Sequence, residues 1–261
     1  MSHGNCLNFE NRIVLVTGGS SGIGRATVLA FARQGATVVF ASRGAEAGIA
    51  LQAEVAQTGG RALYVQADMA KSADIAALVA RAVEEYGRID HAVNNAAAAV
   101  PLTPTAELAE PEADYSLDVN LKGVWLCMKH QLQQMVQQGS STIVNVASVN
   151  GLSGTPMGAL YTATKHGVIG LTRSTALEYI RRGVRINAVC PGLVHTPRLE
   201  QRWSTLSPEQ RVDSMKQLAE SIPIGRFAQP EEVAAAILWL SSQQSSYVVG
   251  QALVVDGGLT A

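Results

Sequence analysis

The chain has 261 residues, of which 47% are hydrophobic and 16% are charged, and its net charge is −1. This balance excludes a strongly basic nucleic-acid binder and leaves enough apolar sequence for one large buried core. No apolar run is long enough to span a membrane, and the polar start of the chain lacks the apolar segment of a secretory signal.

Short apolar runs alternate with longer amphipathic segments along the whole chain. The first half predicts strands at 13–17, 37–41, 61–66 and 89–94 and helices at 22–34, 45–57, 72–86 and 111–138. The second half predicts strands at 142–146, 184–189 and 252–255 and helices at 161–182, 208–220 and 230–241.

Regular alternation of strand and helix predicts a doubly wound parallel sheet of about seven strands, with helices on both faces. The strand runs are mostly unbroken apolar residues, as expected when both faces of a sheet are covered. We therefore predict a single Rossmann-type α/β domain at 11–261 after an N-terminal tail at 1–10. The long connection at about 196–226 is the predicted substrate lid.

The loop between the first strand and the first helix is rich in glycine and serine. Its predicted cofactor contacts are Gly18, Ser20, Ser21, Gly22, Ile23 and Gly24. Glycines allow a tight turn and a close approach to a pyrophosphate, and the following helix N-terminus supplies N–H donors. The position favours a dinucleotide site, although the spacing Gly-x-x-x-Gly-x-Gly departs from the standard Gly-x-Gly-x-x-Gly.

The second strand ends at Ser42-Arg43, with no carboxylate where many dinucleotide folds hold the ribose 2′-hydroxyl. A guanidinium pairs well with a 2′-phosphate, so this end favours NADP(H), with NAD(H) as the alternative. Arg43 has a second interpretation, in which it only stacks on adenine or faces solvent. Asp68, after the third strand, is placed either to meet the adenine amino group or to cap the helix from Ser72.

Tyr161 and Lys165 stand four residues apart in a predicted helix, so their side chains share one face. A fixed positive charge beside a phenol favours the phenolate and lowers the phenol pKa. Such a pair can donate and accept a proton near neutral pH. Taken alone, the spacing also occurs on ordinary solvated helix faces.

Several motifs together resemble the short-chain dehydrogenase/reductase family. The glycine loop is followed, in the family's order and spacing, by Asn94-Asn95-Ala96, Asn120, Ser148, Tyr161-x-x-x-Lys165, Pro191-Gly192 and Thr196. The resemblance runs from Asn11 to Leu259 and fits the compact, single-domain branch. It implies a seven-stranded parallel sheet and an enzyme that reduces carbonyls or oxidises alcohols with NAD(P)(H).

The resemblance also implies residue roles. Tyr161 would be the general acid or base, Lys165 would hold the nicotinamide ribose and lower the tyrosine pKa, and Ser148 would hydrogen-bond the substrate oxygen. Asn120 would hold a water that links Lys165 to solvent. The cofactor contacts would also include Tyr161 and Lys165 themselves, together with Met69, Asn95, Ala96, Pro191, Gly192, Val194 and Thr196. Ala97 departs from the family, which has glycine there, and its methyl group would either crowd the cofactor or force a small shift in the loop.

Predicted substrate contacts besides Ser148 and Tyr161 are Asn150, Met157, Leu193 and Trp203. Trp203 has a second interpretation, in which it only packs the lid. A small carbonyl or alcohol substrate is expected. The function predicted is an NADPH-preferring carbonyl reductase or alcohol dehydrogenase; the alternatives are a non-catalytic NADP-binding regulator and an enzyme like 3-oxoacyl-(carrier protein) reductases. Residues 131–141 carry no basic side chain for docking an acidic carrier, which argues mildly against the last.

The remaining predictions concern location and partners. The three cysteines, Cys6, Cys127 and Cys190, lie far apart and show no metal-binding spacing, as in a reducing cytosol. We therefore expect a cytoplasmic protein with no metal, nucleic-acid or membrane partner. The resemblance implies a homotetramer or homodimer that pairs the helices at 111–138 and 161–182.

Overall fold

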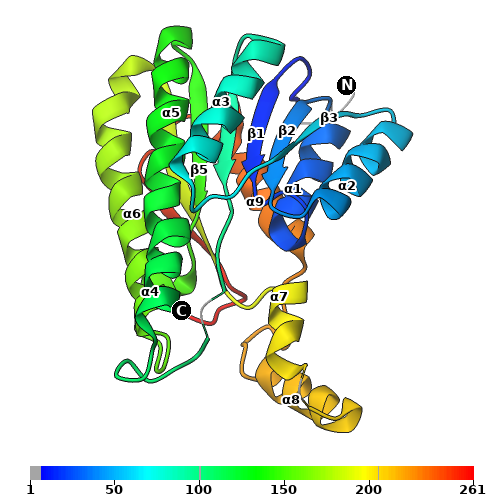
Figure 1. Cartoon of the computed structure of the whole chain (residues 1–261), viewed down its shortest axis with the longest axis vertical. Helices are drawn as coiled ribbons and strands as arrows, with labels where there is room; N and C mark the ends of the chain where they lie inside the picture. The colour runs from blue at the N-terminus through cyan, green and yellow to red at the C-terminus, as the bar shows by residue number, and fades with distance from the viewer. Residues whose placement is uncertain (1–6, 100, 205) are drawn as a thin grey trace.

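A seven-stranded sheet forms the centre of the molecule (Figure 1). The computed structural model describes residues 7–99, 101–204 and 206–261, so most of the predicted tail, Cys6 and Thr205 in the lid lie outside the described residues. The strand order is β3-β2-β1-β4-β5-β6-β7 and every pair is parallel. The strands are β1 Ile13–Thr17, β2 Thr37–Ser42, β3 Arg61–Gln66, β4 His91–Asn94, β5 Ser141–Val146, β6 Val184–Pro191 and β7 Ala252–Val255.

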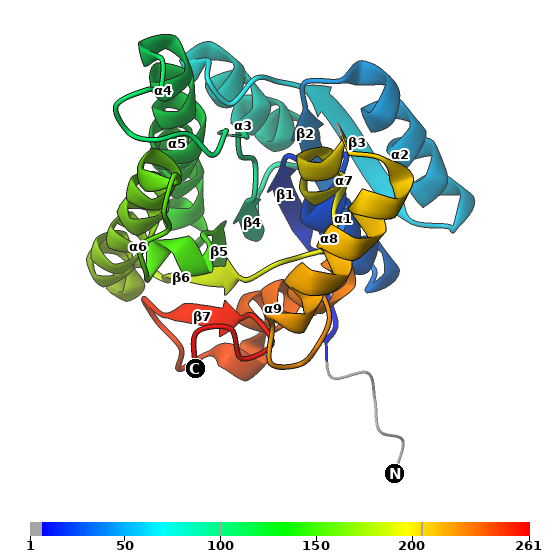
Figure 2. The ribbon, with the colours of Figure 1, turned by 90° about the horizontal axis from the view of Figure 1, so that it is seen from below.

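Helices cover both faces of the sheet (Figures 1 and 2). They are α1 Gly22–Arg33, α2 Ala45–Gln57, α3 Ser72–Tyr86, α4 Glu110–Leu117, α5 Gly123–Gln138, α6 Ala159–Tyr179, α7 Pro197–Glu200, α8 Pro208–Glu220 and α9 Pro230–Ser241. Buried side chains of α1, α2 and α9 form one core with the sheet, and those of α3, α5 and α6 lie in cores on the other face. None of the helices in the described part of the chain is long and apolar enough to cross a bilayer.

The sheet reverses its winding between β1 and β4. The chain moves outward from β1 to β3, then crosses back to place β4 on the other side of β1. At such a point the loops that follow the two adjacent strands run in opposite directions and leave a crevice beyond the carboxyl ends of the strands. The glycine loop after β1 and the Asn95 loop after β4 meet there.

The predicted helix at 111–138 is interrupted. The structure contains α4, a π-helical turn at Asp118–Lys122 and then α5. In this turn the Gly123 N–H donates to the carbonyl of Asp118, five residues back. A Cβ on Gly123 would lie 2.5 Å from the Met69 carbonyl oxygen, so glycine lets the helix approach the loop after β3. The other predicted elements occur with ends shifted by three residues or fewer, because glycines and prolines mark most boundaries.

The lid region has a small apolar core of its own. Leu199, Trp203, Ile222 and Phe227 form a buried cluster that is separate from the cores on the sheet. It joins α7 to the segment after α8, and both helices project beyond the carboxyl ends of the strands (Figure 1). Ser207 begins α8 with a reciprocal capping box to Gln210, which stabilises a helix that buries none of its own residues.

His91 packs at the amino end of β4 among aromatic rings. Its ring centroid lies 5.2 Å from that of Phe9 and 6.4 Å from that of Phe31, and Nδ1 lies 2.7 Å from the Thr142 hydroxyl. Burial lowers the pKa of His91 from its ordinary value of 6.5 to about 4, although the neighbouring Asp90 opposes the shift. The folded protein therefore binds this proton less readily than the unfolded chain does.

Stability should consequently fall as the pH drops from about 6.5 to about 4, because only the unfolded chain takes up this proton in that window. The contribution lost is up to about 3 kcal/mol. Urea unfolding of the wild type and of His91→Phe at pH 7.5, 6 and 5 measures it. The variant, which lacks the titrating ring, should lose less stability over this range; equal losses would contradict the assignment.

Candidate active site

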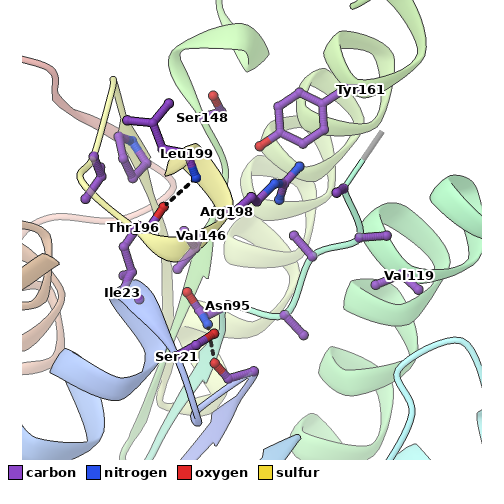
Figure 3. A pocket seen from close by; sticks show the side chains of 18 of the residues that line it. Ser21, Ile23, Asn95, Val119, Val146, Ser148, Tyr161, Thr196, Arg198 and Leu199 are labelled. Carbon is purple, nitrogen blue, oxygen red and sulfur yellow. Dashed lines mark hydrogen bonds between the residues drawn. The ribbon is translucent and has the colours of Figure 1, made fainter. Parts of the chain in front are cut away.

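A large cavity of about 1290 Å³ opens at the carboxyl ends of the strands (Figure 3). Loops that follow β1, β2, β3, β4, β5 and β6 all contribute to its walls, together with α4, α6 and α7. Its volume exceeds that of a typical small-molecule pocket, so it has room for a dinucleotide and a second small molecule.

The glycine loop is held against the Asn95 loop. The Asn95 side-chain amide donates to the carbonyl oxygens of Thr17 and Gly18, each at 3.0 Å. A Cβ on Gly24 would lie 2.0 Å from the Gly18 oxygen and 2.5 Å from Asn95 Nδ2. Gly24 therefore does not line the cavity; it allows the start of α1 to pack against the turn. Ser21, the residue before α1, makes no side-chain cap. The N-terminus of α1, which lines the cavity, is therefore not capped by a protein side chain.

Arg43 and Tyr115 meet across one end of the cavity. The Arg43 guanidinium donates to the Tyr115 hydroxyl and lies 5.9 Å from the centroid of its ring. The sequence does not predict Tyr115, a residue of α4, because nothing local connects it with a strand end far earlier in the chain. Asp68 lines the same cavity and accepts a hydrogen bond from the Ala70 N–H. The alternative helix-cap interpretation of Asp68 is wrong, since the residue that precedes α3 is Lys71.

Tyr161 and Lys165 share one face of α6, and both line the cavity. Lys165 is 1% exposed, and its Nζ lies 5.6 Å from the Tyr161 ring centroid and donates to the Val146 carbonyl at 2.8 Å. Burial lowers the pKa of Lys165, and a negative charge on Tyr161 opposes that shift. The ammonium keeps two N–H groups beyond its bond to β5, which suits a ligand hydroxyl in the cavity.

Ser148 lies at the end of β5, opposite Tyr161 (Figure 3). Its Oγ accepts a hydrogen bond from the Asn150 N–H at 3.1 Å, as the residue that begins a short 3₁₀ turn. A hydroxyl that accepts in this way still has its proton to donate. Ser148 and Tyr161 therefore present two hydroxyl donors to one region of the cavity.

Asn120 lies within the π-helical turn and outside the cavity wall. Its Oδ1 accepts from the Ala98 N–H at 2.7 Å, and its Nδ2 donates to the Ala98 carbonyl and to Ser116 Oγ. The side chain is fully buried. It therefore serves as a buried amide that fixes the loop after β4, and the structure does not place it where its side chain touches the cavity.

Most residues predicted from the sequence line this one cavity. They are Gly18, Ser20, Ser21, Gly22, Ile23, Ser42, Arg43, Asp68, Met69, Asn95, Ala96, Ser148, Asn150, Tyr161, Lys165, Pro191, Gly192, Leu193, Val194 and Thr196. Gly24, Asn120, Met157 and Trp203 do not.

Two predicted substrate contacts point elsewhere. Met157 is 50% exposed in a turn before α6, where its φ of 61° is the left-handed conformation. Trp203 is buried in the lid cluster, with its ring centroid 6.4 Å from that of Phe227. Apolar residues in a lid serve packing as well as binding, and here the packing interpretation of Trp203 holds.

Arg198, in α7, lines the cavity close to Tyr161 (Figure 3). Its guanidinium carbon lies 5.3 Å from the Tyr161 ring centroid. From the sequence, this residue belongs only to the predicted lid at about 196–226. Its approach to the face of α6 that carries Tyr161 depends on the bend after Thr196, whose hydroxyl accepts from the Leu199 N–H and begins α7.

The residues present fit a nicotinamide dinucleotide. The Gly18–Gly24 contact leaves no room for a Cβ, so the loop keeps its backbone N–H groups close to the cavity. Arg43 follows β2, while Lys165 is bonded to β5, and β1 and β4 lie between these two strands, so Arg43 and the Tyr161–Lys165 pair line separate parts of the same cavity. The glycine loop would hold the pyrophosphate, and Lys165 would hold the ribose next to the nicotinamide.

Known proteins resemble this chain over almost its whole length. A family model described as Enoyl-(Acyl carrier protein) reductase matches residues 18–260. The 2,5-dichloro-2,5-cyclohexadiene-1,4-diol dehydrogenase of Sphingobium indicum is 42% identical over 256 residues, which cover 97% of this chain and 99% of that protein. The cis-4-hydroxycyclohexanecarboxylate dehydrogenase of Sinomonas cyclohexanicum is 42% identical over 253 residues, 97% of this chain and 98% of that protein.

Solved structures agree with the fold. The crystal structure of a variant of the actinorhodin polyketide ketoreductase with NADPH superposes with a TM-score of 0.90 at 36% identity. The alignment covers 95% of this chain and 97% of that one. The seven-stranded arrangement therefore belongs to a shared architecture.

Gly24→Ala should weaken NADPH binding by at least about 100-fold, because the new methyl group forces the glycine loop away from Gly18 and Asn95. Fluorescence titration with NADPH measures this, and a melting curve confirms that the variant is folded. Gly170→Ala, at an exposed helix position with nothing within 4 Å, is the matched control and should bind normally. Near-normal binding by Gly24→Ala would contradict the close packing described.

Proposed function

The chain belongs to the short-chain dehydrogenase/reductase family and is an oxidoreductase of that type, and we propose that it interconverts a secondary alcohol and its ketone at Ser148 and Tyr161. One observation carries the proposal. Ser148, Tyr161 and Lys165 come from two elements far from the glycine loop in the sequence, and they line one cavity together with it.

In alcohol oxidation Tyr161 takes the hydroxyl proton and Ser148 hydrogen-bonds the oxygen as it becomes a carbonyl. In reduction Tyr161 returns a proton to the oxygen as negative charge grows there. A bound nicotinamide would accept or supply the hydride. Lys165, held by Val146, keeps a positive charge close to the Tyr161 ring. We propose that Asn120 orders the loop after β4 through its side-chain amide and orders any water beside Lys165 through its backbone.

For the substrate we propose a compact cyclic secondary alcohol or ketone. Two relatives at 42% identity are named for six-membered ring alcohols, which supports this class. An acyl-carrier substrate is the second candidate, because the matching family model is described by such an enzyme. The regulator alternative receives no support, since these relatives are named as dehydrogenases.

For the cofactor we propose NADP(H) over NAD(H). Arg43 presents a guanidinium to the cavity, and the residues directly after β2, Arg43 and Gly44, carry no carboxylate. A guanidinium pairs with a 2′-phosphate through charge-assisted hydrogen bonds. The Arg43 guanidinium is positioned by its hydrogen bond to the Tyr115 hydroxyl. The related ketoreductase structure contains NADPH, which agrees with this choice.

We also propose a homotetramer or homodimer in a reducing cytoplasm. Trp125 and Leu177, on α5 and α6, are 46% and 76% exposed, so these helices offer apolar side chains to a second copy. Cys127 and Cys190 are free and buried, as expected of thiols that form no disulfide in a reducing compartment.

Tyr161→Phe should lower turnover of cyclic ketones by about 1000-fold while NADPH affinity stays within about threefold, because the change removes only the proton donor. Initial rates of NADPH oxidation with cyclohexanone derivatives and 3-oxoacyl thioesters measure this and also separate the two substrate classes. Tyr179→Phe, at the far end of α6, is the matched control. Turnover retained by Tyr161→Phe would refute the proposed acid.

Arg43→Ala should weaken NADPH by at least about tenfold and NADH by less than about twofold, because only NADPH carries the phosphate that the guanidinium pairs with. Dissociation constants for both cofactors measure the difference. Arg33→Ala removes an exposed arginine at the end of α1 and serves as the control. Equal losses for the two cofactors would show that Arg43 does not recognise the phosphate.

A further inference from the structure

Arg198 is a cation at the reacting end of the cavity. Within the described residues it forms no ion pair, while its guanidinium lies over the ring of Tyr161. A second arginine that lies over a tyrosine of α6, Arg182 over Tyr179, is at the opposite end of that helix, away from the cavity. An arginine in a cavity wall that pairs with no protein carboxylate is available to an anionic ligand.

The nearest acid in sequence is engaged elsewhere. Glu200 follows Arg198 by two residues in α7, and residues two apart on a helix do not face each other. One Glu200 oxygen lies 3.2 Å from His195 Nε2, and the other lies 3.7 Å from Arg211 Nη2. Glu200 therefore serves the lid and leaves Arg198 free to face the cavity.

The charges in the cavity are unevenly distributed. Of the acids that line it, Asp68 follows β3, and Glu112 lies one helical turn before Tyr115, the partner of Arg43. Asp68 lies at the end of the cavity away from Tyr161, because β3 is the edge strand on the far side of β2, β1 and β4 from β5. At the reacting end, the described lining holds the cations Lys165 and Arg198. The positive charge of Arg198 contributes to lowering the pKa of Lys165, after burial. An anion bound there would relieve this repulsion.

The cofactor phosphates are an unsuitable partner for Arg198. The glycine loop meets α7 at Thr196, where a Cβ on Gly22 would lie 3.1 Å from Thr196 Cγ2. Thr196 is thus the residue at the start of α7 that lies beside the predicted pyrophosphate site. Arg198 is two residues further on and reaches Tyr161 instead. The cavity wall also includes Leu199 and Leu193, which suit the carbon frame of a substrate.

We propose that Arg198 binds a carboxylate of the substrate, so that the enzyme acts on a compact cyclic hydroxy acid or oxo acid. The carboxylate pairs with the guanidinium while the carbinol or carbonyl faces Ser148 and Tyr161. One planar guanidinium matches one planar carboxylate in two parallel hydrogen bonds. This inference rests on the proposed function, since it names the substrate class of the same site.

Two ketones that differ in one group test the inference. Wild-type kcat/KM for reduction of 4-oxocyclohexane-1-carboxylate should exceed that for 4-oxocyclohexane-1-carboxamide by at least about tenfold. Arg198→Gln should lower kcat/KM for the acid by about 100-fold and for the amide by less than about threefold. Arg198→Lys should recover part of the loss on the acid. Arg182→Gln, the matched control, should leave both values unchanged.

A binding measurement keeps this inference separate from the proposed function. Calorimetric titration of the enzyme–NADPH complex with cyclohexanecarboxylate and with cyclohexanecarboxamide requires no turnover. The acid should bind more tightly than the amide to the wild type and equally to Arg198→Gln.

The outcomes are distinguishable. Equal losses on acid and amide, or a loss of NADPH affinity in Arg198→Gln, would overturn the carboxylate assignment and leave the alcohol–ketone chemistry standing. Turnover of neither ketone nor of any other carbonyl tested would overturn the proposed function. If cyclohexanecarboxylate and cyclohexanecarboxamide bind equally to the wild type, the anion site is overturned, whether or not the enzyme turns over any ketone.

Discussion

One buried hydrogen bond, from the Lys165 ammonium to the Val146 carbonyl at 2.8 Å, ties the first turns of α6 to the end of β5. The charge is almost fully removed from water, which is costly unless a polar partner is supplied. The partner is the last residue of β5, two positions before Ser148. The same bond therefore sets where Tyr161 stands relative to Ser148, because α6 and the end of β5 cannot shift independently of each other.

A network of buried side-chain amides joins the same strands and helices deeper in the molecule. Asn145 Nδ2 donates to the Thr172 hydroxyl on α6, and Asn94 Nδ2 donates to Asn145 Oδ1, each at 2.9 Å. Gln131 of α5 donates in turn to Asn94 Oδ1 at 2.8 Å. Buried polar groups that are fully paired make an arrangement specific, because any displacement leaves one of them unsatisfied. Two strands and two helices are thereby fixed beneath the cavity.

The alternation of apolar runs is enough to predict the sheet and nearly every helix, because the ends carry local marks. Gly87 and Gly139, both in the left-handed conformation, end α3 and α5 where expected. The π-helical turn escapes prediction, since a change of hydrogen-bond register leaves no change in apolar spacing. Contacts across the cavity are harder still: Arg43 and Tyr115 are 72 residues apart. The sequence also does not decide whether Trp203 faces a ligand or the lid.

The separate apolar cluster of the lid has a consequence for which parts of the sequence can change during evolution. Leu199, Trp203, Ile222 and Phe227 pack on one another and not into the cores that cover the sheet. Substitutions there act on the lid's own packing, and the Lys165 anchor shares no residue with this cluster. The wall that meets the substrate can therefore diverge at little risk to the machinery of hydride transfer, and new substrates can be acquired while Tyr161 and Lys165 stay in place.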